Sequence, residues 1–220
     1  PTLIVRDHLL KYLDDGLATG RKLTLVSAPA GFGKTTVISE WIHYRSEAFP
    51  PCRCAWLTLD GNDNQPSHFI SYVVGAFQKI YPDLGQTMLQ VLQSPQAPPM
   101  DIVLTEVINE IVTRYSGDPN EHYLLVLDDY QEITESTIHD AISFLLEQLP
   151  PYWHVVLTTR SDPPLPLSRL RARGQLTELR TADLRFNGAE ISTYLQHVTG
   201  LDYEKADIRA LSARTEGWIA

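Results

Sequence analysis

Cysteine is scarce in this sequence, which has only Cys52 and Cys54 among its 220 residues. The two lie in a C-x-C pair on the approach to an expected strand. That spacing suits no disulfide between them, and two thiols are too few for a structural zinc site. We therefore expect both cysteines to be free thiols.

Long apolar runs are also lacking. No run reaches the roughly 18 residues that a membrane-spanning helix requires. The N-terminus does not show the succession of charged, apolar and small residues that is typical of a signal peptide. These absences argue against a membrane protein and predict a cytoplasmic location.

Positive charge is in the minority, with 18 Lys and Arg against 27 Asp and Glu, a formal net charge of −9. Binding to nucleic acid through phosphate neutralisation needs a clustered basic face, so any DNA role must lie elsewhere. The apolar fraction of 43% is enough for one α/β core, or for a core of about 150 to 180 residues with a small appendage.

The order of apolar patterns predicts strands alternating with helices. Continuous apolar runs predict strands at 23–28, 55–59, 123–127, 155–159 and 176–180. Helical spacing predicts helices at 7–17, 35–45, 101–115 and 137–149, and one that begins near Pro66 and carries apolar residues as far as Ile80. Because strands that are apolar throughout are typical of a parallel sheet covered on both faces, we expect a three-layer α/β fold.

The pattern changes after the last expected strand. Asn187 is placed to cap a helix, with Glu190 at the capping-box position, and a second helix fits 203–214. This part predicts a small helical appendage. No stop signal follows the apolar residues at the end, so we expect the chain to be a piece of a longer protein.

The stretch APAGFGKTT lies between the first strand and the next helix. It follows the P-loop pattern G-x-x-x-x-G-K-[ST], with Ala28 in place of the first glycine. Glycines in such a loop let backbone N–H groups face an anion, which the helix dipole also favours. Lys34 would reach the β- and γ-phosphates of a nucleotide, and the Thr35 hydroxyl would ligate Mg²⁺. The expected nucleotide-binding residues here are Pro29, Ala30, Gly31, Phe32, Gly33, Lys34, Thr35 and Thr36.

Two further features weigh against the alternative that this loop is merely a glycine-rich turn. Asp128 and Asp129 end an apolar strand, which is the Walker B pattern, and the strand's alternation points them in different directions. We assign Asp128 to the metal, with Thr35, and Asp129 to the attacking water. Arg160 ends the next strand, where it could contact the γ-phosphate. The alternatives are an acidic pair that starts a solvated loop, and a surface arginine without a ligand.

Together these features describe a P-loop NTPase of the group that inserts a strand between its Walker strands. The residues also resemble a particular family, the nucleotide-binding domain of STAND ATPases, and within it that of MalT-like, LuxR-type bacterial transcriptional activators. The resemblance runs the length of the chain and rests on SAPAGFGKTT, WLTLDGNDNQPSHFISYV, LLVLDDYQEI, LTTRSDPPLPLSRLRARGQLTEL, LRF with Glu190, and TEGWIA.

The resemblance implies a five-stranded parallel sheet of order 2-3-4-1-5 and two domains. Residues 1–183 would form the P-loop domain, and residues 184–220 the start of a helical lid, truncated here. By the same resemblance the segment LIVRD wraps the adenine through Val5 and Arg6, Arg160 is the sensor, and the terminal GW belongs to the lid. Catalytic roles would fall to Asp129, Lys34 and Arg160.

The family further implies a switch that binds ATP or ADP with Mg²⁺. ADP would hold a closed resting state, and ATP would permit self-association of the full-length protein, with slow hydrolysis. DNA would bind only through a C-terminal helix-turn-helix that is absent from these residues. The main alternative is a catalytic P-loop ATPase or a DNA-dependent motor, which would need a basic face. A scaffold with an inactive site fits poorly, because the expected phosphate and metal ligands are all present.

Other conspicuous residues have simpler interpretations. We expect the polar run 60–64 to close a loop and cap a helix rather than to touch metal. Trp41 and Trp56 should pack in the core and at the sheet edge rather than form an adenine platform. The arginines of 169–173 should lie on an exposed helix face, although Arg171 or Arg173 could contact a partner or a phosphate.

Overall fold

The protein is described here by a computed structural model that covers residues 4–48, 52–92, 98–114, 121–201 and 203–215. Five parallel strands form one sheet in the order β2-β3-β4-β1-β5, as the resemblance implied. The strands are β1 (Leu23–Ser27), β2 (Arg53–Thr58), β3 (Tyr123–Asp128), β4 (Trp153–Thr159) and β5 (Leu176–Arg180).

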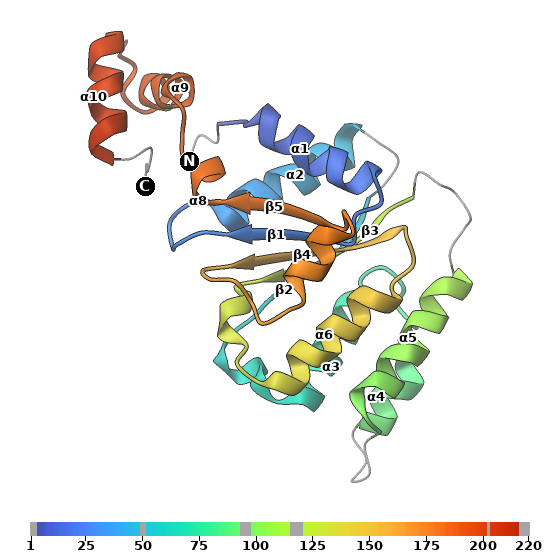
Figure 1. Cartoon of the computed structure of the whole chain (residues 1–220). Helices are drawn as coiled ribbons and strands as arrows, with labels where there is room; N and C mark the ends of the chain where they lie inside the picture. The colour runs from blue at the N-terminus through green and yellow to red at the C-terminus, as the bar shows by residue number, and fades with distance from the viewer. Residues whose placement is uncertain (1–3, 49–51, 93–97, 115–120, 202, 216–220) are drawn as a thin grey trace.

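Helices cover both faces of this sheet, so the expected three-layer α/β fold is confirmed (Figure 1). On one face lie α1 (Asp7–Ala18) and α2 (Lys34–Ala48). On the other lie α3 (Pro66–Phe77), α4 (Gln86–Leu92), α5 (Met100–Arg114), α6 (Ser136–Gln148) and α7 (Leu167–Ala172). Every residue of the central strands β1, β3 and β4 is buried, which explains why their sequences are mainly apolar.

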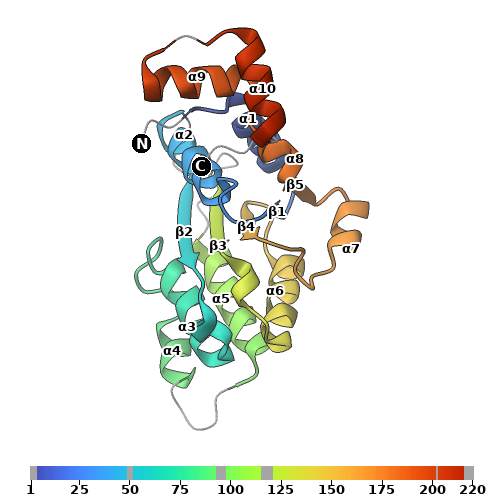
Figure 2. The same cartoon turned by 90° about the vertical axis from the view of Figure 1, so that its left-hand side faces the viewer.

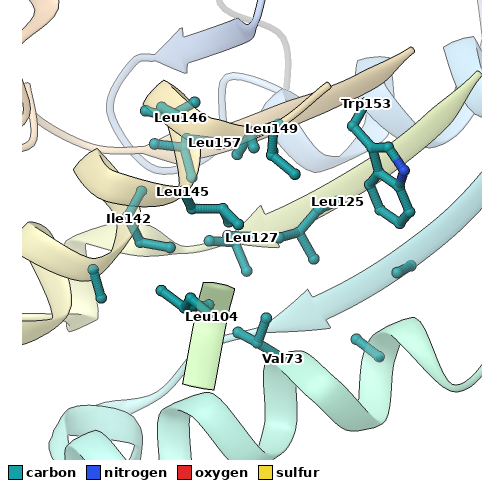
Figure 3. Packing of buried hydrophobic residues seen from close by; sticks show 14 of the residues in the cluster. Val73, Leu104, Leu125, Leu127, Ile142, Leu145, Leu146, Leu149, Trp153 and Leu157 are labelled. Carbon is teal, nitrogen blue, oxygen red and sulfur yellow. The ribbon is translucent and has the colours of Figure 1, made fainter. Parts of the chain in front are cut away.

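The larger part of the core lies between the sheet and the helices α3, α5 and α6. Figure 3 shows Leu125 and Leu127 of β3 and Leu157 of β4 directed towards these helices. Alternate residues of β3 point to the other face, where Leu124 and Val126 pack with α1 and α2. Side chains from the two faces of β3 thus contribute to the hydrophobic cores on both sides of the sheet.

One helix ends earlier than the apolar spacing predicted. The helix expected to reach Ile80 is α3, which ends at Phe77. The side-chain amide of Gln78 donates to the Leu84 carbonyl at 2.8 Å, which closes a turn after the helix. Gly85 follows with φ of 65°, a backbone conformation that favours glycine. This turn also separates off α4, a short helix that the sequence patterns did not predict.

The C-terminal helices α8 (Thr181–Leu184), α9 (Gly188–Thr199) and α10 (Lys205–Thr215) follow β5. Figure 2 shows α9 and α10 beyond the layer of α1 and α2, and Figure 1 places them beside the N-terminal segment. The capping box of Asn187 and Glu190 is formed, as expected. The terminal GW segment lies outside the described residues. Within the described ranges, no helix combines the length and apolar character needed to cross a membrane.

Candidate functional site

The P-loop stretch connects the carboxyl end of β1 to the first residue of α2. Gly31 and Gly33 have φ values of 82° and 71°, left-handed conformations that favour glycine. The Gly33 carbonyl accepts a hydrogen bond from the backbone N–H of Val37 at 2.9 Å, so the loop leads directly into the first turn of α2. Two left-handed glycines ahead of a helix N-terminus fit a phosphate group, because they turn backbone N–H groups towards one concavity.

Lys34 reaches back across this loop. Its Nζ donates to the Pro29 carbonyl at 3.1 Å, and only 7% of the residue is exposed. Desolvation lowers the pKa of Lys34, while the charge of the Asp129 carboxylate opposes the shift and the Arg160 guanidinium adds to it. A poorly solvated ammonium group, held over the loop by a single carbonyl, is well placed to bind a phosphate oxygen instead.

The expected metal ligands Thr35 and Asp128 lie side by side. The Thr35 hydroxyl donates to the Asp128 carboxylate, with oxygen distances of 3.0 Å to Oδ1 and 3.2 Å to Oδ2. The Thr158 hydroxyl of β4 donates to Oδ1 as well, and Asp128 is 3% exposed. A hydroxyl and a carboxylate are oxygen ligands of the kind that Mg²⁺ prefers, so this pair fits the ion. Within the described ranges, no group of three or more His, Cys, Asp or Glu is placed to hold a metal ion by itself.

Asp129 is held differently from its neighbour. It is the one non-glycine residue with positive φ within the described ranges, at φ 58° and ψ 42°. Its backbone N–H donates to the Thr158 hydroxyl at 3.0 Å, and its Oδ1 accepts from Gln131 Nε2 at 2.8 Å. Such outliers cluster at functional sites, where the surrounding contacts maintain them. The two carboxylates therefore have separate partners.

Arg160 follows the last residue of β4 and is exposed. Its backbone N–H donates to Gln131 Oε1 at 3.1 Å. The positive charge of its guanidinium contributes to lowering the pKa of Lys34. Sequence reasoning assigned no role to Thr158 or Gln131, although both contact the expected site residues. Their positions become clear only when β3 and β4 are paired.

The N-terminal segment contacts the C-terminal helices. The Arg6 guanidinium donates to Glu190 Oε1 at 2.9 Å and to the backbone carbonyls of residues 183–185 at 2.9–3.1 Å. It also lies 5.0 Å from the centre of the Phe186 ring. Arg6 is 7% exposed, whereas Val5 is 59% exposed. The Arg6 side chain is thus engaged with protein groups.

A cavity of about 500 Å³ adjoins this contact. It is lined by the N-terminal segment, the start of α1, and α9 with its cap: Ile4, Val5, Arg6, Asp7, His8, Asn187, Ala189, Glu190, Thr193 and His197. The cavity includes both residues that were expected to contact the adenine. That role stays a prediction.

Asp60 and Asp63 form a capping box, but it caps the short 3₁₀ turn η1 (Gly61–Asn64), whereas α3 has no side-chain cap at Gln65. The expected loop closure is present, because the Asn64 side chain joins this loop to the backbone of residues 132–135. Trp41 is fully buried, and its indole N–H donates to Asp14 Oδ1 at 2.7 Å.

The remaining expectations concern Trp56, the cysteines and the arginines near α7. Trp56 lies on β2 at the edge of the sheet. Cys52 and Cys54 are free, and burial raises their pKa values to about 11 and about 12. Arg169 and Arg171 are exposed on α7 and pair with glutamates.

Comparison with known proteins places this site in a family. The AAA ATPase domain family matches residues 3–158. The serine/threonine-protein kinase PknK of Mycobacterium tuberculosis is 32% identical over 219 residues, which is 100% of this chain and 19% of that protein. The HTH-type transcriptional regulator MalT of Yersinia enterocolitica is 33% identical over 215 residues, 98% of this chain and 22% of that protein.

The chain therefore spans about a fifth of the length of these relatives. A chain from the structure of Drosophila ORC bound to AT-rich DNA and Cdc6 overlaps 97% of this chain and 76% of its own length, with 10% identity and a TM-score of 0.47. From the family match, which covers most of the chain, we conclude that this protein belongs to the AAA ATPase domain family and is related to the MalT regulators.

Proposed function

We propose that this ATPase domain is a regulatory switch of the STAND type, like that inferred for MalT-like activators. It would bind ADP in a closed resting state and ATP in an active state, with slow hydrolysis between them. One observation carries this proposal: the carboxyl ends of β1 and β3 bring together Lys34, Thr35, Asp128 and Asp129. Ligands of open parallel sheets bind at this end.

Each side chain then has a distinct task. Lys34 would exchange the Pro29 carbonyl for a phosphate oxygen, with backbone N–H groups of the loop around it. Thr35 and Asp128 would hold Mg²⁺, which supplies positive charge beside the phosphates when it is bound. Asp129 would accept a proton from the attacking water, and Arg160 would contact the terminal phosphate.

The contact between Arg6 and Glu190 supports a switch over a fast enzyme or a motor. It joins the N-terminal segment to α9 through a buried ion pair, which provides a physical basis for a closed state. The neighbouring cavity would take the adenine against Val5 and the Arg6 backbone. The net charge of −9 also disfavours a motor that moves along DNA.

The proposal extends to the longer protein. We infer that it acts in the cytoplasm, self-associates in its ATP state and binds DNA, if at all, through a module outside these residues. The relatives include a serine/threonine-protein kinase and an HTH-type transcriptional regulator. The effector attached to this domain is therefore not fixed by the relationship.

The first test identifies the nucleotide that remains bound to the chain through purification. The chain is denatured without added nucleotide, and the released nucleotide is identified by chromatography and mass spectrometry. We expect near-stoichiometric ADP from the wild type and none from Lys34→Ala. An empty wild-type chain that binds ATP and hydrolyses it rapidly would favour the catalytic alternative and contradict the switch.

A further inference from the structure

Gln131 bridges the ends of two neighbouring strands through its side-chain amide. It lies in the short 3₁₀ turn η2 (Tyr130–Glu132), directly after β3. Its Nε2 donates to Asp129 Oδ1 at 2.8 Å, and its Oε1 accepts the backbone N–H of Arg160 at 3.1 Å. One amide therefore contacts the carboxylate expected to act on water and the backbone of the expected sensor.

The orientation of this amide follows from its partners. A carboxylate can only accept a hydrogen bond and a backbone N–H can only donate one. If the amide were reversed, Oε1 would face the Asp129 carboxylate, which also only accepts, and Nε2 would face the Arg160 N–H, which also only donates. The remaining Nε2 hydrogen faces Glu132 Oε1 at 3.4 Å, which also requires a donor.

The bridge completes a chain of hydrogen bonds across β3 and β4. The backbone N–H of Asp129 donates to the Thr158 hydroxyl, and that hydroxyl donates to Asp128. The backbone of Asp129 is thus attached to β4 through Thr158, and its carboxylate is attached to the residue after β4 through Gln131. A shift of the strand end that carries Arg160 would be transmitted to the Asp129 carboxylate.

We propose that Gln131 is a positioning residue that orients the Asp129 carboxylate and couples it to the backbone of Arg160. This inference rests on the proposed function, because it assigns Asp129 to the attacking water. The bond to Oδ1 leaves Oδ2 as the oxygen that accepts the proton. Gln131 itself acts through Asp129.

The turn does not depend on this amide for its structure. Tyr130 is 1% exposed, and its hydroxyl shares a hydrogen bond of 2.9 Å with His139 Nδ1 on α6. Ile133 is 4% exposed at the other end of η2. Because these neighbours anchor the turn in the core, replacement of the half-buried Gln131 should leave the fold unchanged.

The test compares two variants of nearly the same shape. Gln131→Met loses both hydrogen bonds, and Gln131→Glu keeps the acceptor for Arg160 but loses the donor to Asp129. Gln90→Met, at an exposed position on α4, is the matched control. ATP affinity is measured with a fluorescent ATP analogue, hydrolysis by single turnover of radiolabelled ATP with Mg²⁺, and folding by thermal unfolding.

We expect both Gln131 variants to bind ATP within about twofold of the wild type and to hydrolyse it about tenfold or more slowly, a size typical of a disturbed general base. The control should match the wild type. A residue that merely fills space would be replaced by either variant without loss of rate. An unchanged or faster rate in Gln131→Met would overturn the inference, as would a loss of affinity equal to the loss of rate.

The titration separates this inference from the proposed function. A wild-type chain that fails to bind ATP, or binds it no better than Lys34→Ala does, contradicts the proposed function before any rate is measured. A wild-type chain that binds ATP without hydrolysing it overturns the roles of Gln131 and Asp129 in hydrolysis and leaves nucleotide binding intact.

Discussion

At the scale of single residues, Lys34 and Asp129 attract each other but have separate local partners. Lys34 Nζ donates to a loop carbonyl, whereas the Asp129 carboxylate accepts from a side-chain amide. Loss of either charge should therefore affect a different step. The lysine would contact a phosphate in every bound state, and the aspartate only a water molecule during hydrolysis.

Two substitutions test this separation. Lys34→Ala should weaken nucleotide binding about 10- to 100-fold, because a hydrogen bond from a charged group contributes about 1.5–3 kcal/mol. Asp129→Asn should keep the affinity within about threefold and slow hydrolysis about 100-fold or more. Titration calorimetry and single-turnover hydrolysis measure the two effects. Lys11→Ala, at an exposed lysine of α1, serves as the control. Equal loss of affinity in both variants would refute the separation.

At the scale of elements, the strands were the most predictable part of the fold. The central strands are fully buried, so their apolar runs identified them, and the expected strand 176–180 has the bounds of β5. The edge strand β2, with only Ala55 buried, was found at 55–59 but runs over Arg53–Thr58. The end of α3 was not predictable from spacing, because Gln78 and Gly85 determine it through a turn. A local hydrogen bond and a glycine conformation therefore end this helix before its apolar spacing does.

The candidate site also has a part that the sequence could predict and a part that it could not. The P-loop and the acidic strand end are continuous patterns, so the sequence alone could locate them. The contact between Arg6 and Glu190 joins residues 184 positions apart, and the bridge through Gln131 spans two strands. Such contacts depend on which elements become neighbours, which no local pattern specifies.

The attachment of α9 yields a prediction at this scale. Glu190 accepts from Arg6 and also caps its own helix through the Asn187 N–H at 2.7 Å. Glu190→Ala leaves the Arg6 charge buried without its carboxylate, a change that typically costs about 3–5 kcal/mol. We expect α9 to detach locally, with faster hydrogen exchange in α9 and faster tryptic cleavage after Arg185. Glu106→Ala, at an exposed position of α5, should leave both rates unchanged. If α9 of Glu190→Ala were as protected from exchange and cleavage as that of the wild type, the contact between Arg6 and Glu190 would not be what holds α9 in place.

A buried histidine joins β1 to β4. His154 Nδ1 lies 2.6 Å from the Arg21 carbonyl and must carry the hydrogen, so Nε2 accepts from the Thr24 hydroxyl at 2.8 Å. Desolvation lowers the pKa of His154 to about 4, from 6.5 for an ordinary histidine. The unfolded chain therefore binds a proton between these pH values that the folded chain does not, and stability falls as the pH decreases through this window.

This linkage predicts a loss of about 2 kcal/mol of unfolding free energy from His154 between pH 7 and pH 5, at 1.36 kcal/mol per pKa unit. Burial also lowers the pKa values of His122 and His139, so the comparison with a variant isolates His154. Urea unfolding at both pH values should show the smaller loss in His154→Gln. His68→Gln, an exposed histidine of α3, is the control. Identical pH dependence in His154→Gln and the wild type would rule out this residue as the cause.

At the scale of the whole molecule, the N-terminal segment and α9 lie together beside the carboxyl end of the sheet. The segment before α1 lies beside α9 (Figure 1) and contacts it through Arg6. The cavity that both segments line is at the same junction. A nucleotide with its phosphates at the P-loop and its base in this cavity would touch both the sheet and the C-terminal helices. It would then stabilise the molecule as one unit.

Binding of such a nucleotide should raise the temperature of thermal unfolding. At a concentration of Mg²⁺-ADP that is 100 times its dissociation constant, nucleotide-free protein should gain about 2.7 kcal/mol, or about 5–10 °C in Tm for a chain of this size. Lys34→Ala, with its 10- to 100-fold weaker binding, should gain only about 0.4–1.4 kcal/mol at the same concentration, and Glu190→Ala should gain less than the wild type. Calorimetry with and without ADP measures the shift. If Glu190→Ala shifted as far as the wild type, the nucleotide would be held by the P-loop domain alone, and the closed state would not depend on α9.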